Sequence, residues 1–591
     1  MISQTVKGSV VDLQTRQPIQ RASVAIVDAK TGAYTDKKGE FRIAKVPVGR
    51  HTVRISYVGY EPFVTNIVLT SGKELVINAE LNQTVVTSES VRVVADNGYG
   101  SLSPINPSAI VSSTQFSVDD VERFAGSRMD PARMAQNFAG VLGANDQRND
   151  IIIRGGAPTE LLWRLDGLDI PNPNHFATQG ATGGPICAIN SNLLSNSDFF
   201  TGAFPAEYGD KLSGVFDLRT RKGNKDKYEF MGQLGFNGVE AGAEGPLGIS
   251  DGSFIANYRY SFLDFLDAIG LDFGFSGIPR YQDGTFKLNI SSDESNRFSF
   301  TGIFGISDID IKDSKEDDVV TGDFDTKSGT DFYALGASWE HIFSESIYSK
   351  LTLGSVYTKY RTTDDSITAI GHKPIDFTRW FSMNSSDGYH TAKYEIFYTP
   401  ARGHFLTAGV ESRYKFYDFD QSRTTPSSDD TIPYRVKEKG NAMNLLGYVN
   451  WNWRIFSNLT LNAGLSAQYL EITKESSLEP RVSASWSPFE GHTFSAGFGV
   501  HRQSLPLTAY FEKPGNLDLD FMQSVHYVAG YSVVLSASSL FKVEGYFKDL
   551  SHIPIERDKP SYWSFANSGT GFGTVDTPGE LVSNGKGKKI G

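Results

Sequence analysis

Apolar and polar side chains alternate with a period of two along several stretches in the second half of the chain. Between Leu459 and Tyr469 every second residue is apolar, and the residues between them are Thr, Asn, Gly, Ser and Gln. The same alternation, with Phe in several apolar positions, occurs over 298–306 and 494–500. This period predicts β-strands with one apolar face and one small polar face.

Such strands separate two different solvents. The polar face of a soluble sandwich is typically charged, whereas here it consists mainly of Gly, Ser and Asn. Segments of roughly ten alternating residues, with aromatic ends and long loops on one side, are typical of an outer-membrane β-barrel. We therefore predict an antiparallel transmembrane β-barrel over 223–591, and a mainly β fold overall.

Three polar stretches, 308–327, 361–373 and 421–440, are predicted to be long surface loops. The first holds eight Asp or Glu and three Lys residues. Its spacing matches no EF-hand loop, so we interpret it as a solvated loop rather than a calcium site.

The first 82 residues contain short strand-like segments separated by Gly, Pro, Asn or Asp. This pattern predicts a small β-sandwich. The expected strands are Val6–Asp12, Ala22–Val27, Gly39–Ile43, His51–Tyr57 and Leu75–Leu81.

A second unit is predicted over 101–222, after an extended linker at 83–100 that is rich in Thr, Ser and Val. Apolar residues recur at loosely helical intervals over 117–139, so we expect a helix there. Asp119 or Asp120 is a candidate cap for its first turn. Short strands and Gly-rich loops follow to about Arg221.

Composition narrows the possible functions. The 591 residues carry a formal net charge of -12, and the 56 basic residues are dispersed among 68 acidic ones, which argues against a nucleic-acid partner. The single cysteine, Cys187, excludes an internal disulfide and a structural zinc site built on Cys pairs. No apolar run approaches the roughly 18 residues of a spanning helix, and no export signal is visible at the start.

Enzyme motifs are not found, so we expect no catalytic residues, cofactor or metal. None of the ten His residues belongs to an HExxH or HxxE motif, and no GxSxG is present. Residues 585–589 lack the Walker spacing and are interpreted as a basic turn. His175 is interpreted as a hydrogen-bonded loop histidine rather than a ligand contact.

The first unit closely resembles the carboxypeptidase regulatory-like domain, a transthyretin-like sandwich that implies no peptidase activity. The residues that carry the resemblance are Gly8, Val10, Asp12, Pro18, Ala22, Val24, Thr35-Asp36, Gly39-Glu40-Phe41, Pro47-Val48-Gly49 and Ile55-Ser56-Tyr57-Val58-Gly59-Tyr60.

The second unit resembles the plug domain of TonB-dependent outer-membrane receptors. Its motifs are Ile153-Arg154-Gly155-Gly156, Leu165-Asp166-Gly167-Leu168-Asp169, Pro173-Asn174-His175-Phe176, Gly202-Ala203-Phe204-Pro205-Ala206-Glu207-Tyr208-Gly209 and Leu212-Ser213-Gly214-Val215-Phe216-Asp217-Leu218. Downstream, Glu479-Pro480-Arg481, 497–503 and 543–548 look like barrel strands of the same family. The combination with a regulatory-like domain is typical of the Bacteroidetes, SusC-like branch.

Physical reasoning assigns the plug motifs a structural role. Their glycines allow tight turns and close approach of backbones inside a lumen. Arg154, Asp166, Glu207 and Arg219 supply charges that a polar barrel interior can satisfy. We expect these contacts to hold a plug that can be displaced.

The resemblance also implies a TonB box before the plug. The candidate is Val91, Arg92, Val93, Val94 and Ala95, a short β-branched segment that can add as a strand to a partner's sheet edge. The alternative is that it forms the last strand of the first domain.

The resemblance implies a receptor that binds an extracellular ligand and imports it by energy-coupled remodelling of the plug. Its partners would be outer-membrane lipid and the inner-membrane TonB complex, with a surface lipoprotein as a further candidate. The first domain would lie in the periplasm. The ligand class is not readable from the sequence. Two alternatives remain: a non-transporting outer-membrane assembly or export component, and a β-rich surface adhesin.

Length suggests an incomplete barrel. At roughly 20 to 25 residues per strand, 223–591 provides about 15 to 18 strands, whereas plugged transporters have about 22. We therefore expect a chain cut short at its C-terminus that leaves open strand edges.

Overall fold

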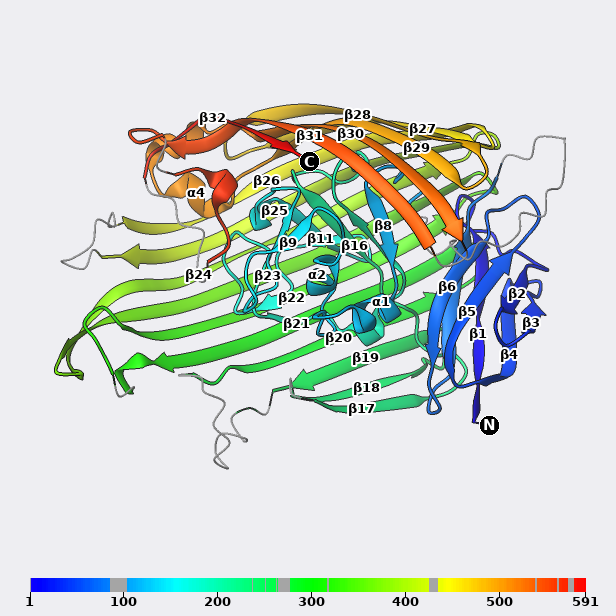
Figure 1. Ribbon diagram of the computed structural model, residues 1–591, viewed down its shortest axis with the longest axis horizontal. Helices are drawn as coiled ribbons and strands as arrows, with labels where there is room; N and C mark the ends of the chain where they lie inside the picture. The colour runs from blue at the N-terminus through cyan, green and yellow to red at the C-terminus, as the bar shows by residue number, and fades with distance from the viewer. Residues whose placement is uncertain are drawn as a thin grey trace.

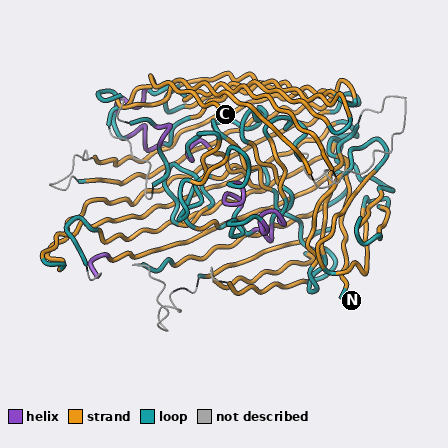
Figure 2. The backbone as a smooth tube through the Cα atoms, viewed as in Figure 1, coloured by secondary structure: helices purple, strands orange, loops and turns teal. Residues whose placement is uncertain are grey.

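The computed structural model describes residues 2–84, 104–235, 238–249, 251–261, 263, 277–315, 318–424, 434–536, 539–560, 563–571 and 579–591. Strands dominate these residues, and the helices are short (Figure 2). Figure 1 shows three parts: a small N-terminal domain at one end, a large curved sheet, and a compact unit inside the curve of that sheet. We call the third part the plug.

The N-terminal domain is the predicted β-sandwich. Its two sheets have the orders β3-β2-β5-β6 and β4-β1-β7, and β1 and β7 run parallel. Val6, Val24 and Ile55 are fully enclosed between the sheets. The strands are β1 Ser3–Asp12, β2 Ser23–Ile26, β3 Thr31–Tyr34, β4 Glu40–Pro47, β5 Gly49–Ser56, β6 Phe63–Leu69 and β7 Leu75–Leu81.

The plug is built on a five-stranded sheet of order β12-β11-β16-β15-β8. Its core centres on Trp163 of β11, which stacks on Phe216 of β16 with 4.3 Å between ring centroids. The strands of the plug are β8 Ser113–Phe116, β9 Val141–Gly143, β10 Ile151–Ile153, β11 Leu161–Leu165, β12 Leu168–Ile170, β13 Asn174–His175, β14 Ile186–Cys187, β15 Ser197–Phe200 and β16 Gly214–Leu218.

The single helix predicted over 117–139 is wrong: the segment forms two short helices, α1 Val118–Arg123 and α2 Pro131–Ala135. Positive φ angles at Gly126 (77°) and Met129 (59°) interrupt the helical path between them. The predicted cap is also wrong, because Ser117 is the N-cap of α1 and Asp120 completes the capping box.

The large sheet has 16 strands among the described residues, each antiparallel to the next along the chain. This number falls within the predicted range. The strands are β17 Glu229–Gly235, β18 Gly238–Pro246, β19 Ser253–Tyr260, β20 Arg280–Ser291, β21 Asn296–Lys312, β22 Phe324–Ile342, β23 Ile347–Ile370, β24 Lys373–Tyr398, β25 His404–Arg423, β26 Tyr434–Phe456, β27 Leu459–Leu470, β28 Glu475–Phe489, β29 His492–Gln503, β30 Met522–Ser536, β31 Ser539–Glu556 and β32 Leu581–Ile590.

The sheet is not closed in the described part of the chain, where β17 and β32 are its end strands and do not pair with each other. This agrees with the expected open edges. None of the helices among the described residues is long and apolar enough to cross a membrane.

The two faces of the sheet differ as predicted from the alternation. On β27, Leu465 and Tyr469 are exposed on the outside, whereas Asn462 and Ser466 are buried on the inside. Exposed aromatic rings lie near the short turns that follow β22, β26 and β28, among them Trp339, Trp451 and Trp486. Such a girdle is typical of the boundary between lipid and water.

The predicted long loops are wrong in their extent. Residues 361–373 form the end of a hairpin in which β23 and β24 stay paired up to the Gly371–His372 turn. Likewise, β21 and β22 stay paired as far as Lys312 and Asp325. Thr-rich polar segments have high β propensity, so the ladder continues past the apolar band.

Replacing Leu465 by Lys tests the outward face. We expect Leu465→Lys to lower the free energy of unfolding by about 2 kcal/mol, because a charge near the middle of the strand would face hydrocarbon. Urea unfolding from lipid bilayers measures the change. Leu465→Ala is the control for loss of the side chain itself, and equal losses in both variants would contradict lipid contact.

Candidate functional site

The contacts between the plug and the sheet wall form the candidate site. The side chain of Arg481 of β28 binds backbone carbonyl groups of the plug loop at 204–208. Its Nη1 donates to the carbonyl oxygens of Pro205 (2.6 Å) and Tyr208 (2.8 Å). Its Nη2 donates to Glu479 Oε2 at 2.8 Å. Two sequence motifs, Glu479-Pro480-Arg481 and Gly202–Gly209, therefore meet although they are far apart in the chain.

Neighbouring strands hold the same part of the plug. Lys548 of β31 is buried, and its Nζ donates to the carbonyl oxygens of Thr201 (3.4 Å) and Ser213 (3.3 Å). The amide of Ala203 donates to His526 Nδ1 of β30 at 3.1 Å. These wall residues recognise backbone groups, so the shape of the loop matters more than its side chains.

Tight packing explains two predicted glycines. A Cβ on Gly214 would lie 2.5 Å from the carbonyl oxygen of Phe200, and Gly167 has φ +93° at the turn between β11 and β12. Both positions therefore require glycine.

The Asp166–Asp169 motif binds a different part of the wall. Lys287 Nζ of β20 lies 3.1 Å from Asp166 Oδ2, and Thr301 donates to the same carboxylate at 2.8 Å. Asp169 is buried and pairs with Arg164 of the plug at 2.5 Å and with Arg413 of β25. Both carboxylates thus connect the plug to the wall through charge-assisted hydrogen bonds.

Two other predicted residues contact the wall. Arg154, at φ 50°, pairs with Glu544 of β31 and donates to Ser112 at 3.0 Å. His175 is buried, and its Nε2 lies 2.9 Å from Asp283 Oδ2 of β20. It is a hydrogen-bonded histidine, as predicted.

Two of the remaining predicted residues form hydrogen bonds within the plug. Asn174 donates to Asn172 Oδ1 at 2.7 Å, and Tyr208 donates to Asp217 Oδ2 at 2.8 Å. Gly156, Phe204 and Ser213 are buried, Gly209 packs against Leu446 of β26, and Gly155 is exposed beside Lys589 of β32. The TonB-box candidate, 91–95, lies outside the described residues.

Glu207 and Arg219 differ from expectation, because their described partners lie outside the wall. Asn106 of the plug donates to Glu207. Arg219 Nη1 lies 3.3 Å from Glu80 Oε2 of the N-terminal domain. The plug is therefore held from two sides.

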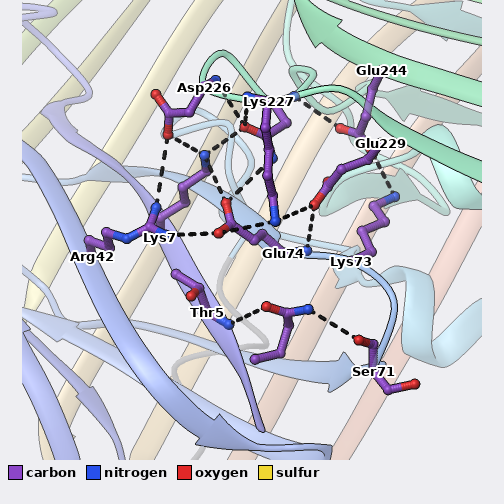
Figure 3. Close-up of polar contacts among 12 residues, drawn as sticks. Thr5, Lys7, Arg42, Ser71, Lys73, Glu74, Asp226, Lys227, Glu229 and Glu244 are labelled. Carbon is purple, nitrogen blue, oxygen red and sulfur yellow. Dashed lines mark hydrogen bonds and ion pairs between the residues drawn. The ribbon is translucent and has the colours of Figure 1, made fainter.

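A second ionic cluster joins the N-terminal domain to the start of the sheet (Figure 3). Glu74 lies 3.0 Å from Lys7 Nζ and 3.3 Å from Lys227 Nζ, and its amide donates to Glu229 at 2.9 Å. Lys73 Nζ lies 2.8 Å from Glu244 of β18. Sequence reasoning missed this junction because its charges look like those of any solvated turn.

Burial raises the pKa of the Glu74 carboxyl, but the hydrogen bonds from Lys7 and Arg42 and their positive charges outweigh burial and lower the pKa to about 2. Among the described side chains, no group of three or more His, Cys, Asp or Glu is placed to hold a metal ion. The arrangement provides docking contacts between the parts of the molecule.

Comparison with known proteins identifies the family. Residues 257–579 match the family described as TonB dependent receptor-like, beta-barrel, and residues 6–93 match the CarboxypepD_reg-like domain. The chain belongs to the TonB-dependent receptor-like β-barrel family. Members of this family are outer-membrane β-barrels, and the SusC-like assignment is supported by the relatives below.

Two curated relatives are similar in sequence. TonB-dependent transporter Oar of Myxococcus xanthus is 24% identical over 253 residues, which cover 41% of this chain and 22% of Oar. TonB-dependent receptor SusC of Bacteroides thetaiotaomicron is 22% identical over 490 residues, which cover 80% of this chain and 45% of SusC. The chain matches less than half the length of either relative.

Solved structures share the fold. The ferric enterobactin receptor PfeA of Pseudomonas aeruginosa has a TM-score of 0.58 at 15% identity, covering 81% of this chain and 76% of that one. The siderophore receptor PirA of Acinetobacter baumannii has a TM-score of 0.55 at 15% identity, covering 81% and 77%.

Substituting Asp169 tests the docking of the plug. Asp169→Asn would leave Arg164 and Arg413 without their shared carboxylate, which we expect to destabilise the docked plug by about 3 kcal/mol. Hydrogen exchange of β11 and β12 measures this loss. The double variant Asp169→Asn/Arg413→Met should recover part of the protection; no recovery would contradict a direct coupling across the plug–wall contact.

The pH dependence of domain docking tests Glu74. Because its pKa of about 2 lies below the ordinary 4.5, the charged carboxylate stabilises the docked domain above about pH 4.5 and loses this effect as pH falls toward 2. Limited proteolysis at the junction with pepsin should show increasing cleavage over that range. Glu74→Gln should flatten the change, and an unaltered slope would contradict the assignment.

Proposed function

We propose that this chain is the receptor part of a TonB-dependent outer-membrane transporter. It binds an extracellular ligand at the loops and plug apex and releases it inward when the plug is remodelled. No covalent chemistry is involved. The observation that carries the proposal is the polar attachment of the plug to the wall by Asp166, Asp169 and Arg481.

Polar attachment suits a plug that must move. Water can replace hydrogen bonds when a plug segment leaves the wall, whereas an apolar interface would lose its main source of stability. The energy would come from an inner-membrane TonB complex that binds Val91–Ala95 by strand addition.

The segment that contains Ile105 and Asn106, after the TonB-box candidate, is attached to the plug sheet. This attachment supports a mechanical connection between the box and the plug. The amides of Ile105 and Asn106 each donate to the Asp198 carboxylate at 2.9 Å. Asp198 lies on β15, inside the plug sheet. A pull on 91–95 would therefore act on the sheet through this carboxylate.

The orientation follows from the same proposal. The N-terminal domain lies in the periplasm, and the opposite end of the sheet faces the outside. The loop after β29, which includes α4 Leu507–Phe511, reaches the plug there, because the Ser504 amide donates to Asp210 Oδ1 at 2.6 Å. This contact would transmit ligand binding to the plug.

The ligand class stays open. PfeA and PirA are named for ferric enterobactin and siderophores, but their 15% identity supports the fold alone. A surface lipoprotein partner stays a prediction from the SusC-like branch. Of the two alternatives, an assembly or export component would not depend on the box for uptake, and a soluble adhesin would not migrate as a heat-modifiable barrel.

Deleting 91–95 tests the coupling. We expect the deletion to abolish capture by a purified TonB C-terminal domain and energised uptake, because the added strand is lost, while ligand binding at the cell surface remains. Deleting the equally long segment 85–89 is the matched control and should retain capture. Both variants must show heat-modifiable migration on gels. Unchanged capture and uptake without 91–95 would refute the assignment of the box.

A further inference from the structure

A chamber that is partly open to solvent, with both polar and apolar lining, lies between the three parts of the molecule. Its volume is about 1160 Å³, and the N-terminal domain, the plug and the sheet each contribute to its walls. Charged side chains of both signs line it. They include Arg16 and Glu80 of the N-terminal domain, Asp217 and Arg219 of the plug, and Lys350 and Glu395 of the sheet.

The N-terminal domain contacts well-separated parts of the sheet rim. On one side, Lys73 pairs with Glu244 of β18 at 2.8 Å. On another, Arg454 of β26 pairs with Glu61 at 2.6 Å. Because β18 and β26 are far apart in the strand order, the domain extends across this end of the curved sheet, as Figure 1 also shows.

A third contact lies between these two. Arg16 extends from the domain to the rim, where its Nε is 3.6 Å from Glu340 of β22 and its carbonyl oxygen accepts from Arg297 of β21 at 2.8 Å. Arg16 also pairs with Glu80, which faces Arg219 of the plug at 3.3 Å. The Arg16–Glu80 pair therefore connects all three parts at the wall of the chamber.

The interface is ionic, so docking and separation can be close in free energy. Two charges that leave water at an interface lose hydration, and their mutual attraction only about balances that loss. An element whose two positions differ little in free energy can be moved by a modest force or ligand.

We propose that the N-terminal domain is an exit gate that narrows the chamber below the plug and must separate from the rim before a ligand can leave. This inference rests on the proposed transport function. The chain leaves the domain at the rim itself, because Arg454 Nη1 donates to the carbonyl oxygen of Gln83 at 2.5 Å. A pull on 91–95 would thus act on the gate at Gln83 and on the plug at Asn106.

Chemical access to the chamber tests the gate without any ligand. Ser338 of β22 lines the chamber, and Ser344 lies exposed in the turn after that strand. In a Cys187→Ala background, Ser338→Cys and Ser344→Cys would each be labelled by a negatively charged methanethiosulfonate reagent in the detergent-solubilised full chain. We expect Ser338→Cys to react at least tenfold more slowly than Ser344→Cys.

Opening the gate should remove this difference. Glu80→Arg places a third cation beside Arg16 and Arg219 and should accelerate labelling of Ser338→Cys at least tenfold, with no change at Ser344→Cys. The charge swap Glu80→Arg/Arg219→Glu should slow the labelling of Ser338→Cys again. If Glu80→Arg does not fold, Glu80→Gln must still accelerate labelling about threefold.

Equal labelling of Ser338→Cys with and without the Glu80 substitutions would overturn the gate. The gate would also be overturned if Ser338→Cys, without a Glu80 substitution, were labelled as fast as Ser344→Cys. Because no ligand or TonB complex is present, the result is independent of the uptake experiment. Gated labelling combined with uptake that ignores deletion of 91–95 would refute the assignment of the box and leave the gate.

Discussion

The inward face of the sixteen-stranded sheet is polar, and this constraint governs everything that the sheet encloses. Outward positions such as Leu465 and Val482 are apolar. The positions that alternate with them face inward and carry Ser, Asn, Glu and Arg. An element inside such a wall shares apolar contacts with some wall residues, such as Ile303, Phe332 and Val356. It must satisfy buried polar groups with hydrogen bonds and ion pairs, because unpaired ones are costly.

The plug meets this requirement with two layers of interaction. Its core, around Trp163 and Phe216, is apolar and also includes the wall residues Ile303, Phe332, Ala334 and Val356. Its outer contacts are ionic, as at Asp169 and Arg413. The ionic contacts at the plug surface can exchange with water, whereas the apolar contacts that the plug shares with β21, β22 and β23 tie its stability to its docking.

The sequence predicted local structure better than it predicted contacts between parts. Period two identified the strand at Leu459–Leu470 because each face meets its own solvent. It failed at 361–373, where polar residues continue a hairpin whose pairing depends on the partner strand. The helix over 117–139 failed because Met129 adopts a positive φ that no apolar period reveals. The plug motifs were recognised as a set, but Arg481 and Glu74 were missed as docking residues since their partners are distant in sequence.

The choice of partner explains the glycines and proline of the plug loops that Arg481 and Lys548 contact. Arg481 and Lys548 donate to carbonyl oxygens of the loop, which every residue possesses. What these donors require is a backbone path that presents the carbonyls at the right places, and Pro205 and Gly214 restrict that path. Charged wall side chains then supply the attraction, while the plug supplies geometry. A loop bound in this way can be drawn off the wall and returned to it without a change in any side-chain charge, which is the property that repeated displacement of the plug requires.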